Sequence, residues 1–137
     1  MNIAAASSHI RVARPTSQLA ELIEFYCDGL GLEAIDRFRE HRGFSGVMIG
    51  LPGTDFHLEF TSHKDELEHP VGLAPTKDNL LVFYVPDAAN VASVASRMDS
   101  LGYSTVDPVN PYWADAHALT FEDPDGWRVV VVPAPYS

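Results

Sequence analysis

The sequence predicts an α+β fold in which one β-α-β-β-β unit occurs twice along a chain of 137 residues. The first observation is a repeat. Pro15-Thr16 opens a helical stretch, and Pro86-Asp87 opens another 71 positions later. The second is that a glycine closes each stretch at that same offset, Gly31 in one and Gly102 in the other. The third is that strand-like runs follow both. Self-similarity at a fixed offset indicates tandem structural modules.

The first copy begins with HIRVAR (9–14), whose alternation of polar and apolar residues is typical of a half-buried strand. Pro15 ends this strand, Thr16 is a candidate N-cap, and apolar residues recur at helical spacing up to Leu30. Gly29 and Gly31 supply residues that can stop the helix. Three further strands are expected: LEAIDRF, GFSGVMIGL and FHLEFTS, with a turn at Pro52-Gly53 between the last two.

The second copy repeats this order. LLVFYV is almost wholly apolar, which favours a central strand, and an amphipathic helix follows it as far as Leu101. YSTVDPV, HALTFE and WRVVVV are expected to be the remaining strands. The last two are joined by a strong turn signal, Asp123-Pro124-Asp125-Gly126.

We therefore expect one domain, 1–137, with module one at 9–62, a polar linker at 63–78 and module two at 79–133. Units of about 50–60 residues bury too little surface to be stable alone, so the modules should share a core. Two such modules predict one curved eight-stranded mixed sheet with helices on its outer face. The concave inner face would suit a small molecule.

The charge excludes some partners. Nine basic against nineteen acidic residues give a net charge of -10, which argues against nucleic acid or an anionic membrane as the partner. Five basic residues nevertheless fall within the first 42 positions, as either a solvated strand face or a local anion site. They are Arg11, Arg14, Arg37, Arg39 and Arg42.

The remaining composition points to a cytoplasmic, soluble protein. MNIAAASS has no basic region or sustained apolar run, so we do not expect a signal peptide. No stretch reaches the roughly 18 apolar residues of a membrane span. The single cysteine, Cys27, excludes an internal disulfide and is expected to be a packed thiol.

Two motifs resemble those of a known family. FYCDGLGL after the first helix and FEDPDGWRVVV at the C-terminus are similar to the vicinal oxygen chelate superfamily. This superfamily includes glyoxalase I, extradiol dioxygenases, fosfomycin-resistance enzymes and bleomycin-binding proteins. The likeness runs from His9 to Pro133 and implies the fold of glyoxalase and bleomycin-resistance proteins. It also implies a homodimer, for which VFYV and VVVV would leave apolar edges.

In metal-using members of that superfamily, the ion is held by residues from the first and fourth strands of each half. The repeat offset maps these positions onto His9, Glu59, Leu80 and Val130. The resemblance thus implies His9 and Glu59 as ligands of a divalent metal (zinc, nickel, manganese or iron). Leu80 and Val130 cannot bind metal, so the set is incomplete. Glu59 is also the candidate catalytic base, because a carboxylate on an inner strand face needs a metal, a base role or a cationic partner.

Other residues could line the same site. Counting back from Phe25-Tyr26 without a gap puts Arg11 at the first ligand position, where it would pair with Glu59 and fill the space of an ion. His57 shares a strand face with Glu59, and His117 is expected to open the seventh strand. Tyr112 and Trp113 belong to a loop that could stack on a planar ligand. Structural or surface roles remain open for all of these side chains.

Three functions follow as alternatives. The first is a glyoxalase-type lyase or isomerase that uses a metal held by Glu59 and His9. The second is a metal-free protein of bleomycin-resistance type that binds or sequesters a hydrophobic or aromatic small molecule. The third is an enzyme without metal in which Glu59 acts as general base.

Overall fold

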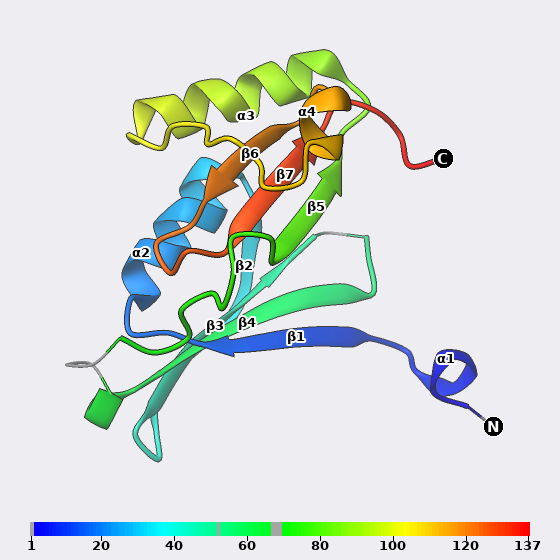
Figure 1. The fold of residues 1–137 in the computed structure, drawn as a ribbon. Coiled ribbons are helices and arrows are strands. Elements are labelled where there is room, and N and C mark those ends of the chain that lie inside the picture. Colours follow the sequence, from blue (N-terminus) through cyan, green and yellow to red (C-terminus); the bar gives the residue numbers. More distant parts are fainter. Residues whose placement is uncertain (1, 52, 67–69) are drawn as a thin grey trace. The chain divides into compact units, whose positions relative to one another are not determined.

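The computed structural model describes residues 2–51, 53–66 and 70–137. The chain divides into two compact units. The first comprises Met1–Cys27 and Gly31–Gly72, and the second comprises Asp28–Leu30 and Leu73–Ser137. Figure 1 labels their helices and strands. No helix among the described residues is long and apolar enough to cross a membrane.

The first unit is a four-stranded sheet with helical segments. Its strand order is β1-β4-β3-β2, with β1 parallel to β4 and antiparallel pairing elsewhere. A π-helical segment, η1, directly continues α2, and a 3₁₀ turn, η2, follows β4. The elements are α1 (Ile3–Ala6), β1 (Ile10–Pro15), α2 (Leu19–Ile23), η1 (Glu24–Gly29), β2 (Glu33–His41), β3 (Phe44–Gly50), β4 (Phe56–His63) and η2 (Lys64–Glu66).

Local sequence explains the turns of this unit. The N-cap of α2 is Gln18, without a side-chain capping bond, rather than the expected Thr16. The Thr16 hydroxyl instead accepts a 2.9 Å hydrogen bond from the Gln18 N–H, and Gly31 follows the helix with a φ of 81°. Arg42 and Gly43, with φ of 53° and 86°, link His41 to Phe44, as a two-residue hairpin turn requires positive φ at both positions. Gly53 also has a positive φ, whereas Pro52 lies outside the described residues.

The second unit repeats part of this plan. Its strand order is β5-β7-β6, with β5 parallel to β7 and β6 antiparallel to β7. Asp87, the repeat equivalent of Thr16, caps the long helix by accepting a 2.8 Å hydrogen bond from the Ala89 N–H. The elements are β5 (Leu80–Tyr84), α3 (Ala88–Ser100), α4 (Tyr112–Asp115), β6 (Leu119–Glu122) and β7 (Arg128–Val132).

The expectation of one eight-stranded sheet is wrong in detail. The described residues form seven strands in two sheets, because the segment YSTVDPV (103–109) is not a strand. Val106 donates one 2.9 Å hydrogen bond to the Thr120 carbonyl. Pro108 has no N–H with which to extend that ladder. The segment therefore remains irregular.

The expected strand positions in the second copy are also corrected. β5 lies at a sheet edge rather than at the centre, and β7 is the central strand. Val129 to Val132 are all nearly inaccessible to solvent, so the VVVV run does not provide the exposed apolar edge that was expected. A continuous apolar run is what a strand covered on both faces requires.

The two faces of the first sheet differ in character. Leu58 and Phe60 of β4 are buried, as are Val47 and Ile49 of β3. Phe60 packs against the ring of Tyr26 in η1, with 5.1 Å between ring centroids. Because side chains alternate along a strand, the residues between these core positions project from the opposite face of the sheet.

Candidate functional site

The polar candidates of the first unit meet on that opposite face. β1 and β4 lie side by side in the sheet (Figure 1). Their parallel register places Arg11 beside His57 and Ala13 beside Glu59. Within each strand the side chains two residues apart share a face. His9, one residue before β1, also contacts His57. The fold thus brings together four of the residues that the sequence indicated.

A chain of hydrogen bonds connects three of these side chains. The Arg11 Nε–H donates to His57 Nε2 over 2.7 Å, so this imidazole nitrogen carries a lone pair and no proton. The ring proton of neutral His57 is therefore on Nδ1, which lies 2.5 Å from His9 Nε2 and donates to it. Arginine cannot give up its proton, so it fixes the tautomer of His57 and, through it, that of His9.

Burial lowers the pKa of His57 below its ordinary value of 6.5, the positive charge of Arg11 lowers it further, and His9 adds a smaller electrostatic effect in the same direction. Glu59 raises this pKa, but its effect is the smallest of the four. These causes favour the neutral imidazole, which agrees with its acceptance of a hydrogen bond from Arg11. His57 is thus a fixed neutral group near pH 7.

Glu59 has a cationic neighbour and open acceptor sites. Its Oε2 lies 3.5 Å from Arg11 Nη1, and its side chain is 14% exposed against 47% for Arg11. Within the described part of the chain, this long contact is the one hydrogen bond that the carboxylate accepts. Lone pairs on both carboxylate oxygens therefore remain available to a ligand.

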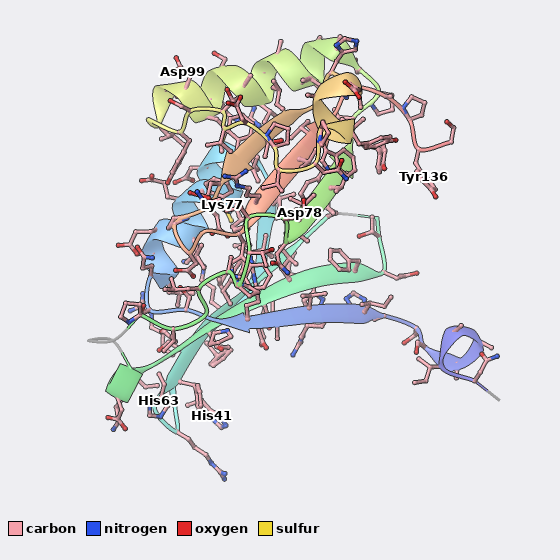
Figure 2. The ribbon with its side chains drawn as sticks, in the orientation of Figure 1. His41, His63, Lys77, Asp78, Asp99 and Tyr136 are labelled. Carbon is pink, nitrogen blue, oxygen red and sulfur yellow. The ribbon has the colours of Figure 1, made fainter. Side chains whose placement is uncertain are left out.

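Two further histidines among the described residues of the first unit stand apart from this cluster. His41 ends β2 and His63 ends β4, and the strand registers place both next to Phe44 beside the β2–β3 turn (Figure 2). His63 lies six residues along β4 from His57. Neither histidine can join His57 and Glu59.

The donor set on this face does not fit a divalent metal. Among the residues that the structure describes, no three His, Cys, Asp or Glu side chains are grouped so as to hold an ion. His9 uses its Nε2 as acceptor toward His57, and the guanidinium of Arg11 lies against Glu59. A metal ligand must offer a free lone pair, and a fixed positive charge repels a second cation.

The aromatic candidates belong to the second unit. Tyr112 and Trp113 lie on α4, with an edge-to-face contact of 4.9 Å between ring centroids. Tyr112 is largely exposed, whereas the Trp113 indole N–H is buried and has no hydrogen-bond partner among the described residues. His117 does not open a strand as expected. It precedes β6 with a φ of 59°, because its N–H bonds to Ala114 in the turn after α4.

In the second copy, the residues at the equivalent positions are either hydrogen-bonded within the same unit or apolar. Arg128 is the repeat equivalent of His57, and only 6% of it is exposed. Its Nε–H donates to Glu122 over 3.3 Å and its Nη1 donates to the Asp107 carbonyl over 2.9 Å. Val130 stands where Glu59 would be. The described polar cluster therefore belongs to the first copy.

Sequence reasoning missed the contact between the two histidines. His9 and His57 were separate candidates, whereas the structure links their rings at 4.6 Å between centroids. The available signal was the predicted β-α-β-β-β order. A first and fourth strand that pair in parallel bring residues near 10 beside residues near 57.

Most of the chain is similar to known proteins. A family model described as the YycE-like N-terminal domain matches residues 10–61, and one described as the YycE-like C-terminal domain matches residues 78–132. The chain belongs to the YycE-like family. It is 49% identical over 124 residues to protein YycE of Bacillus subtilis (strain 168), an alignment that covers 90% of this chain and 86% of that protein.

Solved structures agree with this family and place it in the vicinal oxygen chelate superfamily. The crystal structure of a YycE protein from Bacillus subtilis, of unknown function and grouped with glyoxalase and fosfomycin resistance proteins, has a TM-score of 0.85 and 45% identity. That similarity covers 95% of this chain and 92% of the other.

Two more distant structures show the same fold. Leishmania major glyoxalase I, which is trypanothione-dependent, has a TM-score of 0.66 at 16% identity and covers 94% and 88% of the two chains. The antibiotic-binding protein TnmS3 of Streptomyces sp. CB03234 has a TM-score of 0.63 at 20% identity and covers 93% and 96%. The resemblance seen in the sequence is thereby confirmed. At these identities the likeness concerns the fold alone.

Proposed function

We propose that this YycE-like protein binds a small, largely apolar molecule without a metal, and that Arg11 and Glu59 recognise its polar group. The observation that carries the proposal is the 3.5 Å pairing of the Arg11 guanidinium with the Glu59 carboxylate. In this pairing a permanent side-chain cation replaces the ion that metal-using relatives would hold. Arg11 supplies hydrogen-bond donors and Glu59 supplies acceptors, so a ligand group with one of each fits both.

The surroundings of the pair support an apolar or aromatic ligand. Met48 is the ladder neighbour of Glu59, and its side chain shares the same face. The ring of Phe38 covers Gly46, and the side chain of Ile35 covers Gly50, again on this face. An apolar surface with a few polar groups is the usual composition of a small-molecule site.

Benzamide is a suitable probe, because its carbonyl can accept from Arg11 while its amide N–H donates to Glu59. Binding to protein purified without chelator would be followed by chemical shifts, together with elemental analysis. We expect saturable binding without stoichiometric metal, and an affinity about tenfold lower in Glu59→Gln, since hydrogen bonds to charged groups are worth about 1.5–3 kcal/mol. Arg42→Gln, at a hairpin turn, is the matched control. Stoichiometric metal that Glu59→Gln loses would refute the proposal.

A second candidate is an enzyme in which Glu59 moves a proton. The open lone pairs of its carboxylate favour this reading, because a general base needs an unoccupied acceptor within reach of its substrate. Thiol adducts of 2-oxoaldehydes test it directly. Turnover that Glu59→Gln abolishes would make the protein a lyase or isomerase, and absence of turnover alongside benzamide binding would leave a receptor.

We further propose a homodimer in the cytoplasm. β1 is an edge strand of its sheet and exposes apolar side chains, with Ile10 60% and Val12 41% exposed. Open apolar edges are aggregation-prone unless another surface covers them. A dimer by light scattering that Val12→Lys converts to monomer would support the proposal, and a monomeric parent protein at micromolar concentration would exclude it. Tyr112, Trp113 and His117 remain predicted ligand contacts, testable by alanine substitution.

A further inference from the structure

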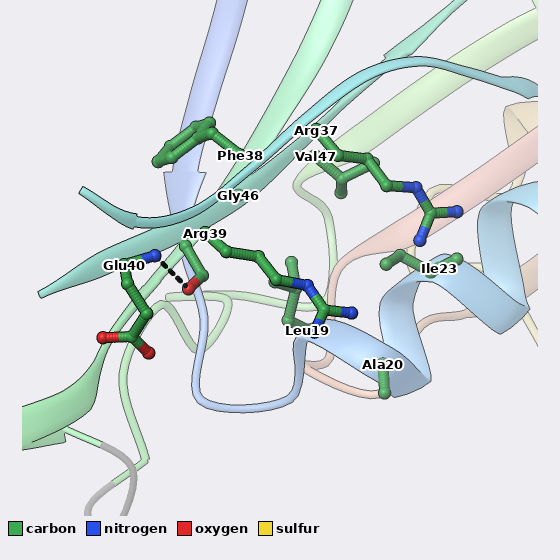
Figure 3. Close-up of a pocket in the computed structure, with 10 residues that line it drawn as sticks. Leu19, Ala20, Ile23, Arg37, Phe38, Arg39, Glu40, Gly46 and Val47 are labelled. Carbon is green, nitrogen blue, oxygen red and sulfur yellow. Dashed lines mark hydrogen bonds between the residues drawn. The ribbon is translucent and has the colours of Figure 1, made fainter.

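A cavity lies within the first unit, on the face of the sheet opposite Glu59. It has a volume of about 380 Å³ and is bounded by α2 and by the strands β2 and β3 (Figure 3). Ligand sites commonly span about 300–1,000 Å³, so it is large enough for a small molecule. The register separates it from the Arg11–Glu59 site, because Val47 lines it whereas Glu59 pairs with Met48, the next residue on β3.

The floor of this cavity is apolar. Leu19 and Ile23 are four residues apart on α2 and therefore project from one face of that helix. Val47 of β3 completes the floor from the sheet side. A hydrocarbon chain can lie along these three side chains and leave water.

The rim of the cavity carries two arginines. Arg37 and Arg39 are two residues apart on β2, so their side chains leave the same face of the strand about 6.6 Å from each other. Arg37 pairs with Val47 in the ladder and thus shares the face of the cavity. Figure 3 shows both side chains reaching across toward α2.

Neither guanidinium is neutralised within the described residues, where no ion pair involves Arg37 or Arg39. Glu40 also lines the cavity, and its N–H donates to the Ser45 hydroxyl over 3.3 Å. Its carboxylate extends away from both guanidinium groups (Figure 3). Two arginines over an apolar floor therefore leave positive charge unmatched, in a chain whose net charge is -10.

The second copy of the repeat lacks these charges. The positions equivalent to Arg37 and Arg39 in the second copy, 71 residues later, are Pro108 and Asn110. The repeat thus carries paired arginines at these positions in the first copy only.

We propose that this cavity binds a small amphipathic anion, namely a carboxylate or a phosphate monoester with a short hydrocarbon tail. The anionic group lies between Arg37 and Arg39, since guanidinium groups bind carboxylate and phosphate oxygens through pairs of charge-assisted hydrogen bonds. The tail lies along Leu19, Ile23 and Val47.

The test titrates octanoate, octyl phosphate, octanol and inorganic phosphate separately into the full chain, by calorimetry and by backbone amide shifts. We expect saturable binding of octanoate or octyl phosphate, with shifts at Leu19–Ile23, and affinities at least tenfold lower for octanol and for inorganic phosphate. The double variant Arg37→Gln/Arg39→Gln should reduce the affinity for the octyl anion at least tenfold. Arg42→Gln, in the same hairpin but outside the cavity, should leave it unchanged.

Preference for octanoate or for octyl phosphate assigns the headgroup, and either result supports the proposal. Four results would overturn it: no saturable binding of either anion, full affinity in the double variant, an equal loss in Arg42→Gln, or equal affinity for octanol. Gln replaces an exposed Arg in each case, so folding should be preserved, and circular dichroism of each variant verifies this.

Discussion

The Nε–H of Arg11 donates a 2.7 Å hydrogen bond to Nε2 of His57, and this contact sets the protonation of the residues around it. It makes the arginine a neighbour of two groups at once, since its Nη1 also faces Glu59.

Replacing Arg11 by Gln should raise the pKa of His57. Burial is the largest cause that lowers this pKa and would persist, but the charge of Arg11 is the second cause and would be lost. Titration of the His57 ring signals by NMR checks this. Arg42→Gln serves as control, and an unchanged His57 pKa in Arg11→Gln would show that the guanidinium does not perturb the ring.

Stability should depend on pH through His57. Its folded-state pKa lies below the ordinary value of 6.5, so the unfolded chain takes up a proton at a higher pH than the folded chain does. The contribution of His57 to the free energy of unfolding is fully present above its unfolded-state pKa. It is lost as the pH falls from there through the lowered folded-state pKa. Urea unfolding between about pH 5 and pH 8 should show this decline, and His57→Asn should reduce it.

Glu59→Gln should leave the fold nearly intact while it weakens binding. Arg11 is 47% exposed, and partly solvated ion pairs contribute about 0–1 kcal/mol, so the free energy of unfolding should fall by no more than that. Urea unfolding at pH 7 checks stability, and benzamide binding checks function. A loss of several kcal/mol would instead assign Glu59 a structural role.

Gly72→Ala should destabilise the protein strongly. A Cβ atom at this position would lie 1.8 Å from the Pro15 carbonyl oxygen, and the φ of Gly72 is 72°. The clash would force the backbone to move, and this cost adds to that of a left-handed conformation. The free energy of unfolding should therefore fall by at least about 2 kcal/mol. Gly102→Ala is the matched control. Its φ is 87° but its Cβ would meet nothing within 4 Å, so only the conformational cost, about 1–2 kcal/mol, applies.

The sequence predicted the order of elements well where local chemistry decides it. Asp87 caps α3 and Gly102 ends it in the left-handed region, as the repeat indicated. The irregular segment 103–109 was missed because its alternation resembles a strand, while pairing depends on partners far along the chain. The buried valines of β7 were taken for an edge, because an apolar run does not reveal which strands flank it.

The sequence predicted which residues belong to the site but not which of them contact each other. Strand periodicity placed His57 and Glu59 on one face, and the proposed Arg11–Glu59 pairing is present at 3.5 Å. The hydrogen bond between His9 and His57 depends on the register of two strands 48 residues apart, which no local pattern encodes. From the sequence, Arg37 and Arg39 could be recognised only as part of a basic segment. Their position over an apolar floor beside α2 depends on the tertiary fold.

Among the described residues the Trp113 indole N–H has no hydrogen-bond partner, and this gives the molecule an intrinsic optical probe. A buried tryptophan normally donates to some acceptor, and one that does not should emit at short wavelength. Any solute that accepts this proton would shift the fluorescence to the red. Trp127, the second of the two tryptophans in the chain, provides the reference emission once a Trp113→Phe variant is measured.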